Sequence, residues 1–169
     1  MILELPVGAL LVLIGPSGSG KSTFATRHFG RTQVLSSDAF RALVADDPVD
    51  QTATDAAFEL LHTALGLRLA RRRLSVVDAT NVERWARERL LGIARRFGRP
   101  AAAVVFDVPL ETCLARNEAR LVGRVPPAAL RRQHRGMRES LAILPTEGFD
   151  RVVVIGAEEA ETLAVQIKA

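Results

Sequence analysis

The sequence predicts an α/β fold in which a five-stranded parallel sheet carries helices on both faces. Short, continuous apolar runs alternate with longer segments that have apolar residues at helical spacing, which is typical of buried parallel strands joined by helices. The first buried run ends in a glycine-rich loop, and helical spacing begins directly after that loop. With 169 residues, 48% of them hydrophobic, we expect a single domain over residues 1–169.

Each element follows from a local pattern. We expect strands at residues 10–14, 33–36, 74–78, 101–106 and 151–155. We expect helices after the glycine-rich loop and over residues 37–44, 51–73, 83–97, 110–121, 128–144 and 158–168. Asp50 suits an N-cap, and Pro100 ends the helix before the fourth strand. Because right-handed crossovers leave few topologies, ligands should bind at the carboxyl ends of the strands, around the first one.

The glycine-rich loop fits the phosphate-binding pattern G-x-x-x-x-G-K-[ST] from Gly15 to Ser22. Its backbone N–H groups and the helix that follows form an anion site, so the chain is predicted to bind ATP or another nucleoside triphosphate. Lys21 would reach the β and γ phosphates, and the Ser22 hydroxyl would hold Mg²⁺. The predicted nucleotide-binding residues of this segment are Gly15, Ser17, Gly18, Ser19, Gly20, Lys21, Ser22 and Thr23.

A carboxylate and an arginine follow the second strand. Asp38 and Arg41 are three residues apart at a helix start, so they share one face. Asp38 can accept the proton of an attacking hydroxyl, and Arg41 can hold an anionic acceptor. The alternative is an N-capping aspartate beside a surface arginine.

Arginines dominate the segment after the fourth strand. Arg116 and Arg120 lie four apart before a Gly/Pro connector, as in a lid, here over residues 116–135, whose guanidinium groups stabilise charge on a transferring phosphoryl group. Arg131, Arg132, Arg135 and Arg138 come next, and they form either a solvated face or contacts to a nucleic-acid backbone.

Three residues at the end of the third strand or shortly after it each have two alternative interpretations. Asp78 ends that strand and acts either in the Mg²⁺ shell, through water, or as a loop cap. Asn81 positions either the acceptor or the loop. Trp85, the sole tryptophan, either packs in its helix or stacks on a base.

The amino-acid composition gives information on charge, disulfides and the cellular compartment. The net charge is +4, and only Lys21 and Lys168 of the 23 basic residues are lysines, so a lysine in the phosphate loop indicates a specific role. The single cysteine, Cys113, excludes an internal disulfide. We find no membrane span and no signal peptide at the N-terminus, and we expect a cytoplasmic protein.

Taken in order, these motifs resemble the polynucleotide 5′-kinase module of bacterial RNA-repair proteins. The segments that carry the resemblance are Gly15–Ala25, Ser36–Arg41, Asp46–Thr52, Val76–Asn81 and Arg116–Arg120. The resemblance implies a P-loop kinase fold with a helical lid and transfer of the γ-phosphate of an NTP to a 5′-OH end of RNA or DNA, with Mg²⁺. It also implies Asp38 as general base, Arg41 at the acceptor, and Arg116 and Arg120 on the phosphates.

In the bacterial proteins this module precedes phosphatase and ligase modules, so we expect an excised domain or a stand-alone relative. Two other functions fit part of the pattern. A small-molecule kinase for a sugar, sugar acid or nucleoside would use Lys21, Asp38 and the lid arginines equally well. A nucleotide-dependent binding switch would need no base such as Asp38.

Overall fold

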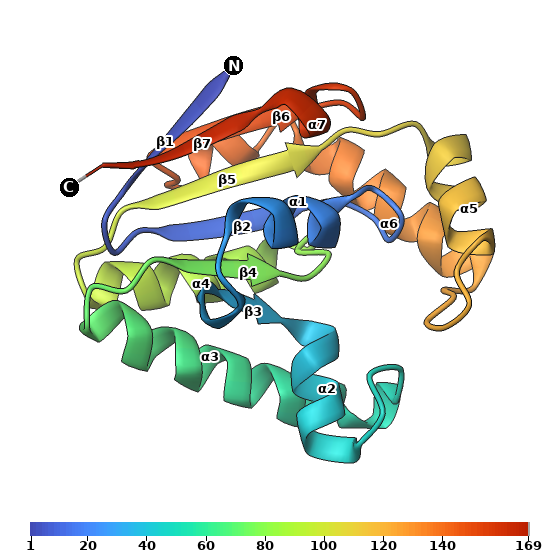
Figure 1. The fold of residues 1–169 in the computed structure, drawn as a ribbon, viewed down its shortest axis with the longest axis horizontal. Helices are drawn as coiled ribbons and strands as arrows, with labels where there is room; N and C mark the ends of the chain where they lie inside the picture. The colour runs from blue at the N-terminus through green and yellow to red at the C-terminus, as the bar shows by residue number, and fades with distance from the viewer. Residues whose placement is uncertain (169) are drawn as a thin grey trace.

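The computed structural model describes residues 1–168, and its larger sheet is parallel with five strands in the order β3-β4-β2-β5-β6 (Figure 1). These strands are β2 (Leu10–Ile14), β3 (Val34–Ser36), β4 (Ser75–Asp78), β5 (Ala101–Phe106) and β6 (Arg151–Ile155). The apolar run 10–14 is buried at every position because β2 lies at the centre of the sheet. The predicted five-stranded parallel sheet is confirmed.

Six helices connect the strands. They are α1 (Lys21–His28), α2 (Ser37–Ala45), α3 (Thr54–Ala70), α4 (Arg84–Arg96), α5 (Leu110–Glu118) and α6 (Pro127–Ser140). Three single turns of 3₁₀-helix are η1 (Arg31–Gln33), η2 (Gln51–Ala53) and η3 (Leu144–Thr146). The predicted helix over 51–73 is therefore shorter, because Asp50 caps η2 rather than α3. The helix predicted over 128–144 ends at Ser140, and Leu144 begins η3.

The sheet separates two apolar cores. Leu11 and Leu13 of β2 face Phe24 and Ala25 of α1 on one side. Leu10, Val12 and Ile14 of β2 face the other core, which is formed by α3, α4 and part of α6. This alternation along one strand places helices on both faces, as the sequence predicts.

The C-terminal prediction is wrong. Residues 158–168 form one helical turn, α7 (Glu159–Thr162), followed by the strand β7 (Ala164–Lys168). This strand pairs in parallel with β1 (Ile2–Pro6), an element that the sequence did not indicate, so a two-stranded sheet joins the two ends of the described chain (Figure 1). Leu3 and Leu5 of β1 are fully buried. Pairing over such a sequence separation leaves no local signal.

The carboxyl ends of β2, β3, β4 and β5 point to the same edge of the sheet (Figure 1). The glycine-rich loop, the start of α2, Asp78 and the segment before α5 therefore meet there. None of the helices within residues 1–168 is both long and apolar enough to span a membrane.

Candidate active site

The phosphate loop, residues 15–20, runs from β2 to α1 and is shaped by glycines. Gly18 has φ +79°, and a Cβ there would stand 2.5 Å from the Cys113 carbonyl oxygen of α5. Gly20 has φ +101° and precedes the first turn of α1. Only glycine fits both positions without strain, so the loop can curl beneath the N-terminus of α1. That arrangement directs N–H groups and the positive end of the helix dipole toward the predicted phosphates.

Lys21 lies beneath this loop and is 7% exposed. Its Nζ donates to the carbonyl oxygens of Gly15 and Pro16, both at 2.8 Å. Burial lowers the pKa of Lys21 to about 8, and the Asp78 carboxylate opposes this effect because its negative charge raises the pKa of Lys21. Anionic oxygens of a bound triphosphate would favour the ammonium form.

Ser22 and Asp78 supply neighbouring oxygens. Burial raises the pKa of Asp78, and the nearby Ser22 side chain lowers that pKa with a smaller effect. A hydroxyl and a carboxylate that lie near one another match the oxygen ligands that Mg²⁺ prefers. Within residues 1–168, no three His, Cys, Asp or Glu residues gather in a way that could hold a metal ion. Ser22 and Asp78 are the predicted magnesium-site residues, and the fold brings them to the same edge of the sheet.

Asp38 and Arg41 form an ion pair at the same edge of the sheet. The Asp38 side chain is 72% exposed, whereas that of Arg41 is only 12% exposed; Nη1 of Arg41 lies 2.7 Å from Oδ1 of Asp38. Nε of Arg41 donates to the Thr54 hydroxyl at 3.1 Å. Ser36, rather than Asp38, caps α2, so the alternative of a capping aspartate with a surface arginine is wrong. The Asp38 charge lies near enough to raise the pKa of both Lys21 and Asp78.

Both predicted lid arginines lie beside the phosphate loop. Nη1 of Arg116 donates to the Gly18 carbonyl at 3.3 Å, and the charge of Arg120 lowers the pKa of Lys21. Asn117, between them, is buried and exchanges two hydrogen bonds of 2.9 Å with the Val125 backbone, which shapes the connector between α5 and α6. The sequence did not mark this bracing role.

A cavity of about 270 Å³ adjoins the phosphate loop. Its wall includes the loop glycines, Arg116 and Arg120, together with side chains that the sequence did not single out. These are Phe24, Arg27, Ala157, Ala160 and Glu161. The segment after β6 thus becomes part of the candidate site through the fold alone.

Two residues after β4 differ from one another in exposure. Asn81 is buried at φ +49°, and its Nδ2 donates to the Leu13 carbonyl at 2.8 Å, so this side chain braces the loop after β4 against β2. Trp85 is 67% exposed, so the alternative of helix packing is wrong.

The arginines of α6 differ in their partners. Arg131, Arg132 and Arg135 are exposed and form no ion pair with any residue in the described range, whereas Arg138 pairs with Asp107.

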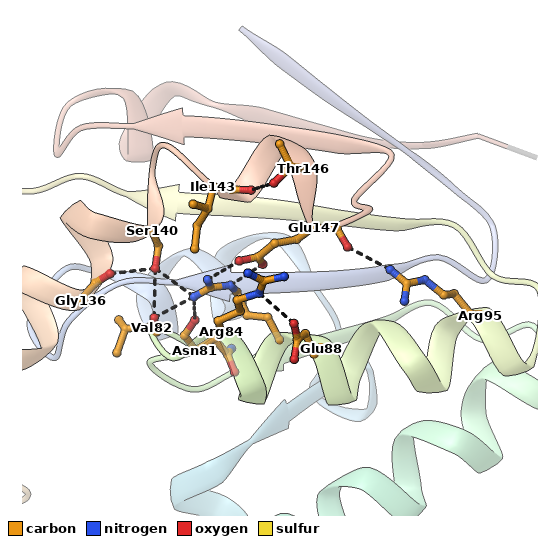
Figure 2. Close-up of polar contacts among 11 residues, drawn as sticks. Asn81, Val82, Arg84, Glu88, Arg95, Gly136, Ser140, Ile143, Thr146 and Glu147 are labelled. Atoms are coloured by element: carbon orange, nitrogen blue, oxygen red, sulfur yellow. Dashed lines mark hydrogen bonds and ion pairs between the residues drawn. The ribbon is translucent and has the colours of Figure 1, made fainter.

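A buried ion pair that the sequence analysis missed supports this region. Arg87 of α4 and Glu147 after η3 are both buried and form two hydrogen bonds of 2.7 and 2.6 Å. Arg87 also donates to the carbonyls of Asn81 and Val82 and to Ser140, whose position at the end of α6 is shown in Figure 2. The loop after β4, α4 and α6 are therefore joined by one network.

Comparisons with known proteins agree with this fold. A model of a family described as an AAA domain matches residues 10–143. No curated protein matches the sequence.

Among solved structures, the chain is similar to one from the Pnkp1/Rnl/Hen1 RNA repair complex, with a TM-score of 0.68 and 23% identity. The match covers 81% of this chain and 45% of the other, so this chain spans less than half of that neighbour. A gluconokinase from Sinorhizobium meliloti 1021 is similar over 90% of this chain and 84% of its own, with 23% identity and a TM-score of 0.55. The Mycobacterium tuberculosis APS kinase CysC, in complex with AMPPNP and APS, matches over 93% and 95%, with 19% identity and a TM-score of 0.55.

Proposed function

The chain belongs to the AAA domain family and has the fold of P-loop kinases, and from this premise we propose that it is a polynucleotide 5′-hydroxyl kinase. It would transfer the γ-phosphate of a nucleoside triphosphate to the 5′-OH end of RNA or DNA. The observation that carries the kinase part is the arrangement at the sheet edge: an exposed carboxylate, Asp38, lies beside a phosphate loop with a buried lysine.

The donor side of the site is built to hold phosphates. The unpaired N–H groups of the loop and the first turn of α1 bind phosphate oxygens, and Lys21 exchanges its carbonyl partners for the β and γ phosphates. Arg116 and Arg120 stabilise the charge that spreads over the phosphoryl oxygens during transfer. When bound, Mg²⁺ at Ser22 and Asp78 would neutralise part of the phosphate charge.

The acceptor side would be organised by Asp38 and Arg41. Arg41 is fixed by Thr54, so its guanidinium group holds the Asp38 carboxylate in place. Asp38 accepts the proton of the attacking hydroxyl, and Arg41 contacts a phosphate next to that hydroxyl. Asn81, committed to the backbone of β2, supports the loop rather than the acceptor itself.

The polynucleotide part of the proposal rests on the surface around this site. Arg131, Arg132 and Arg135 project from α6 without ion-pair partners in residues 1–168, so their charge is available to backbone phosphates. Trp85 offers an exposed aromatic surface on which a base could stack. The similarity to a component of an RNA repair complex supports the same assignment. Because this chain covers 45% of that neighbour, the proposal concerns the kinase step alone.

The test is transfer from γ-labelled ATP, with Mg²⁺, to a single-stranded oligonucleotide that ends in a 5′-OH group. The control acceptor is the same oligonucleotide with a 5′-phosphate, which has no hydroxyl at that end to attack. We expect label on the first oligonucleotide only. Equal labelling of both, or of neither, would contradict the proposal.

A small-molecule kinase is the second candidate, and one observation favours it. The gluconokinase and the APS kinase match this chain over nearly their whole lengths, whereas the RNA-repair neighbour is more than twice as long as the region it shares. Lys21, Asp38, Arg116 and Arg120 would have the same roles in such an enzyme. The two candidates differ in the acceptor, because only a polynucleotide needs the unpaired arginines of α6.

A further inference from the structure

Helix α6 contacts the phosphate loop through a side chain that has no role in the mechanism above. The backbone N–H of Ser17 donates to Oε1 of Gln133 at 3.0 Å. Two other loop N–H groups bind backbone carbonyls: that of Gly15 donates to Thr80 after β4, and that of Ser19 donates to Pro16 within the loop. The N–H groups of Gly18 and Gly20 have no hydrogen-bond partner within residues 1–168, so they are left for phosphates. The N–H of Ser17 thus differs from these groups, because it donates to a side chain of a helix that is distant in the sequence.

This hydrogen bond acts on the same peptide group as Lys21. The carbonyl oxygen of Pro16 accepts from Nζ of Lys21 at 2.8 Å, and the N–H of the same peptide belongs to Ser17. The Pro16–Ser17 peptide plane is therefore held on one side by Lys21 and on the other by Gln133. When Lys21 turns to phosphate oxygens, the Pro16 carbonyl keeps its hydrogen bond from the Ser19 N–H, and Gln133 becomes the remaining side chain that holds that peptide.

Gln133 can serve this role because α6 is fixed further along. Gly136 faces Val82, and a Cβ at Gly136 would lie 3.6 Å from the Val82 side chain, at ordinary van der Waals distance. Oγ of Ser140 lies 2.7 Å from the Gly136 carbonyl oxygen and 3.1 Å from the Val82 carbonyl oxygen (Figure 2). Arg87, paired with Glu147, donates to Ser140 as well. A functional side chain on a rigidly held helix keeps its geometry better than one on a free loop.

We propose that Gln133 is a positioning residue for phosphoryl transfer, holding the Pro16–Ser17 peptide in place while Lys21 exchanges its carbonyl partners for phosphate oxygens. The proposal deepens the proposed function because it assumes that the loop binds nucleotide phosphates. It does not depend on the nature of the acceptor, so nucleotide binding alone can test it.

The experiment compares Gln133→Leu and Gln133→Glu with a control on the same helix, Glu139→Gln, whose side chain is exposed and forms no ion pair in the described chain. Amide hydrogen exchange of the Ser17 segment and affinity for ADP are measured for each protein. We expect faster exchange in the leucine variant and roughly fivefold weaker ADP binding, the effect of one lost neutral hydrogen bond. The glutamate variant should restore protection of Ser17, because a carboxylate oxygen accepts the same bond.

Two results would overturn the proposal. One is wild-type exchange and ADP affinity in Gln133→Leu; the other is equal loss of protection in Gln133→Leu and Gln133→Glu, which would indicate packing rather than the hydrogen bond. Both measurements proceed without an acceptor. A protein that shows the expected exchange and ADP affinities but labels no oligonucleotide would retain the role of Gln133 and lose the polynucleotide assignment.

Discussion

At the scale of single residues, Lys21 and Asp38, to which we assign the donor and the acceptor side, differ in their burial. Lys21 is buried against the loop carbonyls, whereas the Asp38 carboxylate is exposed on the neighbouring helix and held by Arg41. Replacing each residue should therefore impair a different step: phosphate binding for Lys21 and proton acceptance for Asp38. The sequence located both residues because the phosphate-loop pattern and the position after a strand are local signals. It could not locate Gln133 or Arg87, since only the packing of α6 and α4 gives those side chains their partners.

Asp38→Ala should keep nucleotide affinity within a few-fold and lower the turnover of phosphoryl transfer by roughly 100-fold or more, because proton acceptance is lost while the residues at the phosphate loop are unchanged. Steady-state kinetics with an ADP-binding titration measures both. Glu59→Gln, which changes an exposed acid on α3, is the control. Near-normal turnover in the Asp38 variant would exclude it as the base.

Arg41 and Arg116 should differ in their dependence on the acceptor. Arg116→Ala should slow transfer to every acceptor alike, because Arg116 lies at the phosphate loop, on the donor side that all acceptors share. Arg41→Ala should impair most the acceptors that carry a phosphate next to the attacking hydroxyl. The measurement is kcat/KM for a nucleoside and for an oligonucleotide. Equal losses of the Arg41 variant on both acceptors would contradict an acceptor contact.

At the scale of elements, the buried Arg87–Glu147 pair joins α4 to the segment after η3 and to the loop after β4. Nearby on α4, Arg84 and Glu88 form an exposed pair with a single hydrogen bond of 2.8 Å, whereas the buried pair has two (Figure 2). Removing one partner of a buried pair leaves an uncompensated charge, whereas solvent screens an exposed pair.

Arg87→Met should therefore lower the free energy of unfolding by about 3–5 kcal/mol, measured by urea denaturation. Arg84→Ala is the matched control, with an expected change of about 0.5 kcal/mol or less. Similar losses from both substitutions would show that the buried pair does not hold these elements together.

The packing of α3 against α4 should make stability depend on pH through His62. Its Nδ1 is buried with no hydrogen-bond partner in residues 1–168, and its ring lies 5.9 Å from that of Phe58. Burial, with a smaller effect from the Arg89 charge, lowers the pKa of His62 from 6.5 to about 4. The unfolded chain therefore binds a proton at a higher pH than the folded chain does, so stability is lost as the pH falls from about 6.5 to about 4.

Between pH 7 and pH 4.5, the His62→Leu variant should lose about 1 kcal/mol less free energy of unfolding than the wild type does. The difference is small because His62 is only partly buried. Urea denaturation at pH 7 and pH 4.5 measures the difference. His28, whose pKa is also lowered, is present in both proteins, so the comparison isolates His62. Parallel profiles for the two proteins would contradict the assignment.

At the scale of the whole molecule, strands were predictable where residues carry strong local patterns and were missed where pairing is distant. The run Leu10–Ile14 indicated a buried strand because every position is apolar, whereas its central place in the sheet came only from the structure. Residues 158–168 contain acidic and apolar residues that also fit a helix, and only pairing with β1 makes the second half a strand. The cavity beside the phosphate loop was missed for the same reason, because Ala157 and Glu161 line it together with the loop only in the folded chain.

The central claim is that the acceptor is a polynucleotide end, and the most direct measurement compares acceptors at two salt concentrations. Transfer from labelled ATP would be measured to gluconate, a free nucleoside, a 3′-mononucleotide and a ten-nucleotide RNA. We expect the RNA to be the best acceptor, with an affinity that falls with salt at a log–log slope of about −1 to −3, as a few phosphate contacts on a single strand predict. If gluconate or the nucleoside is the best acceptor at both salt concentrations, the polynucleotide assignment is wrong and the chain is a small-molecule kinase.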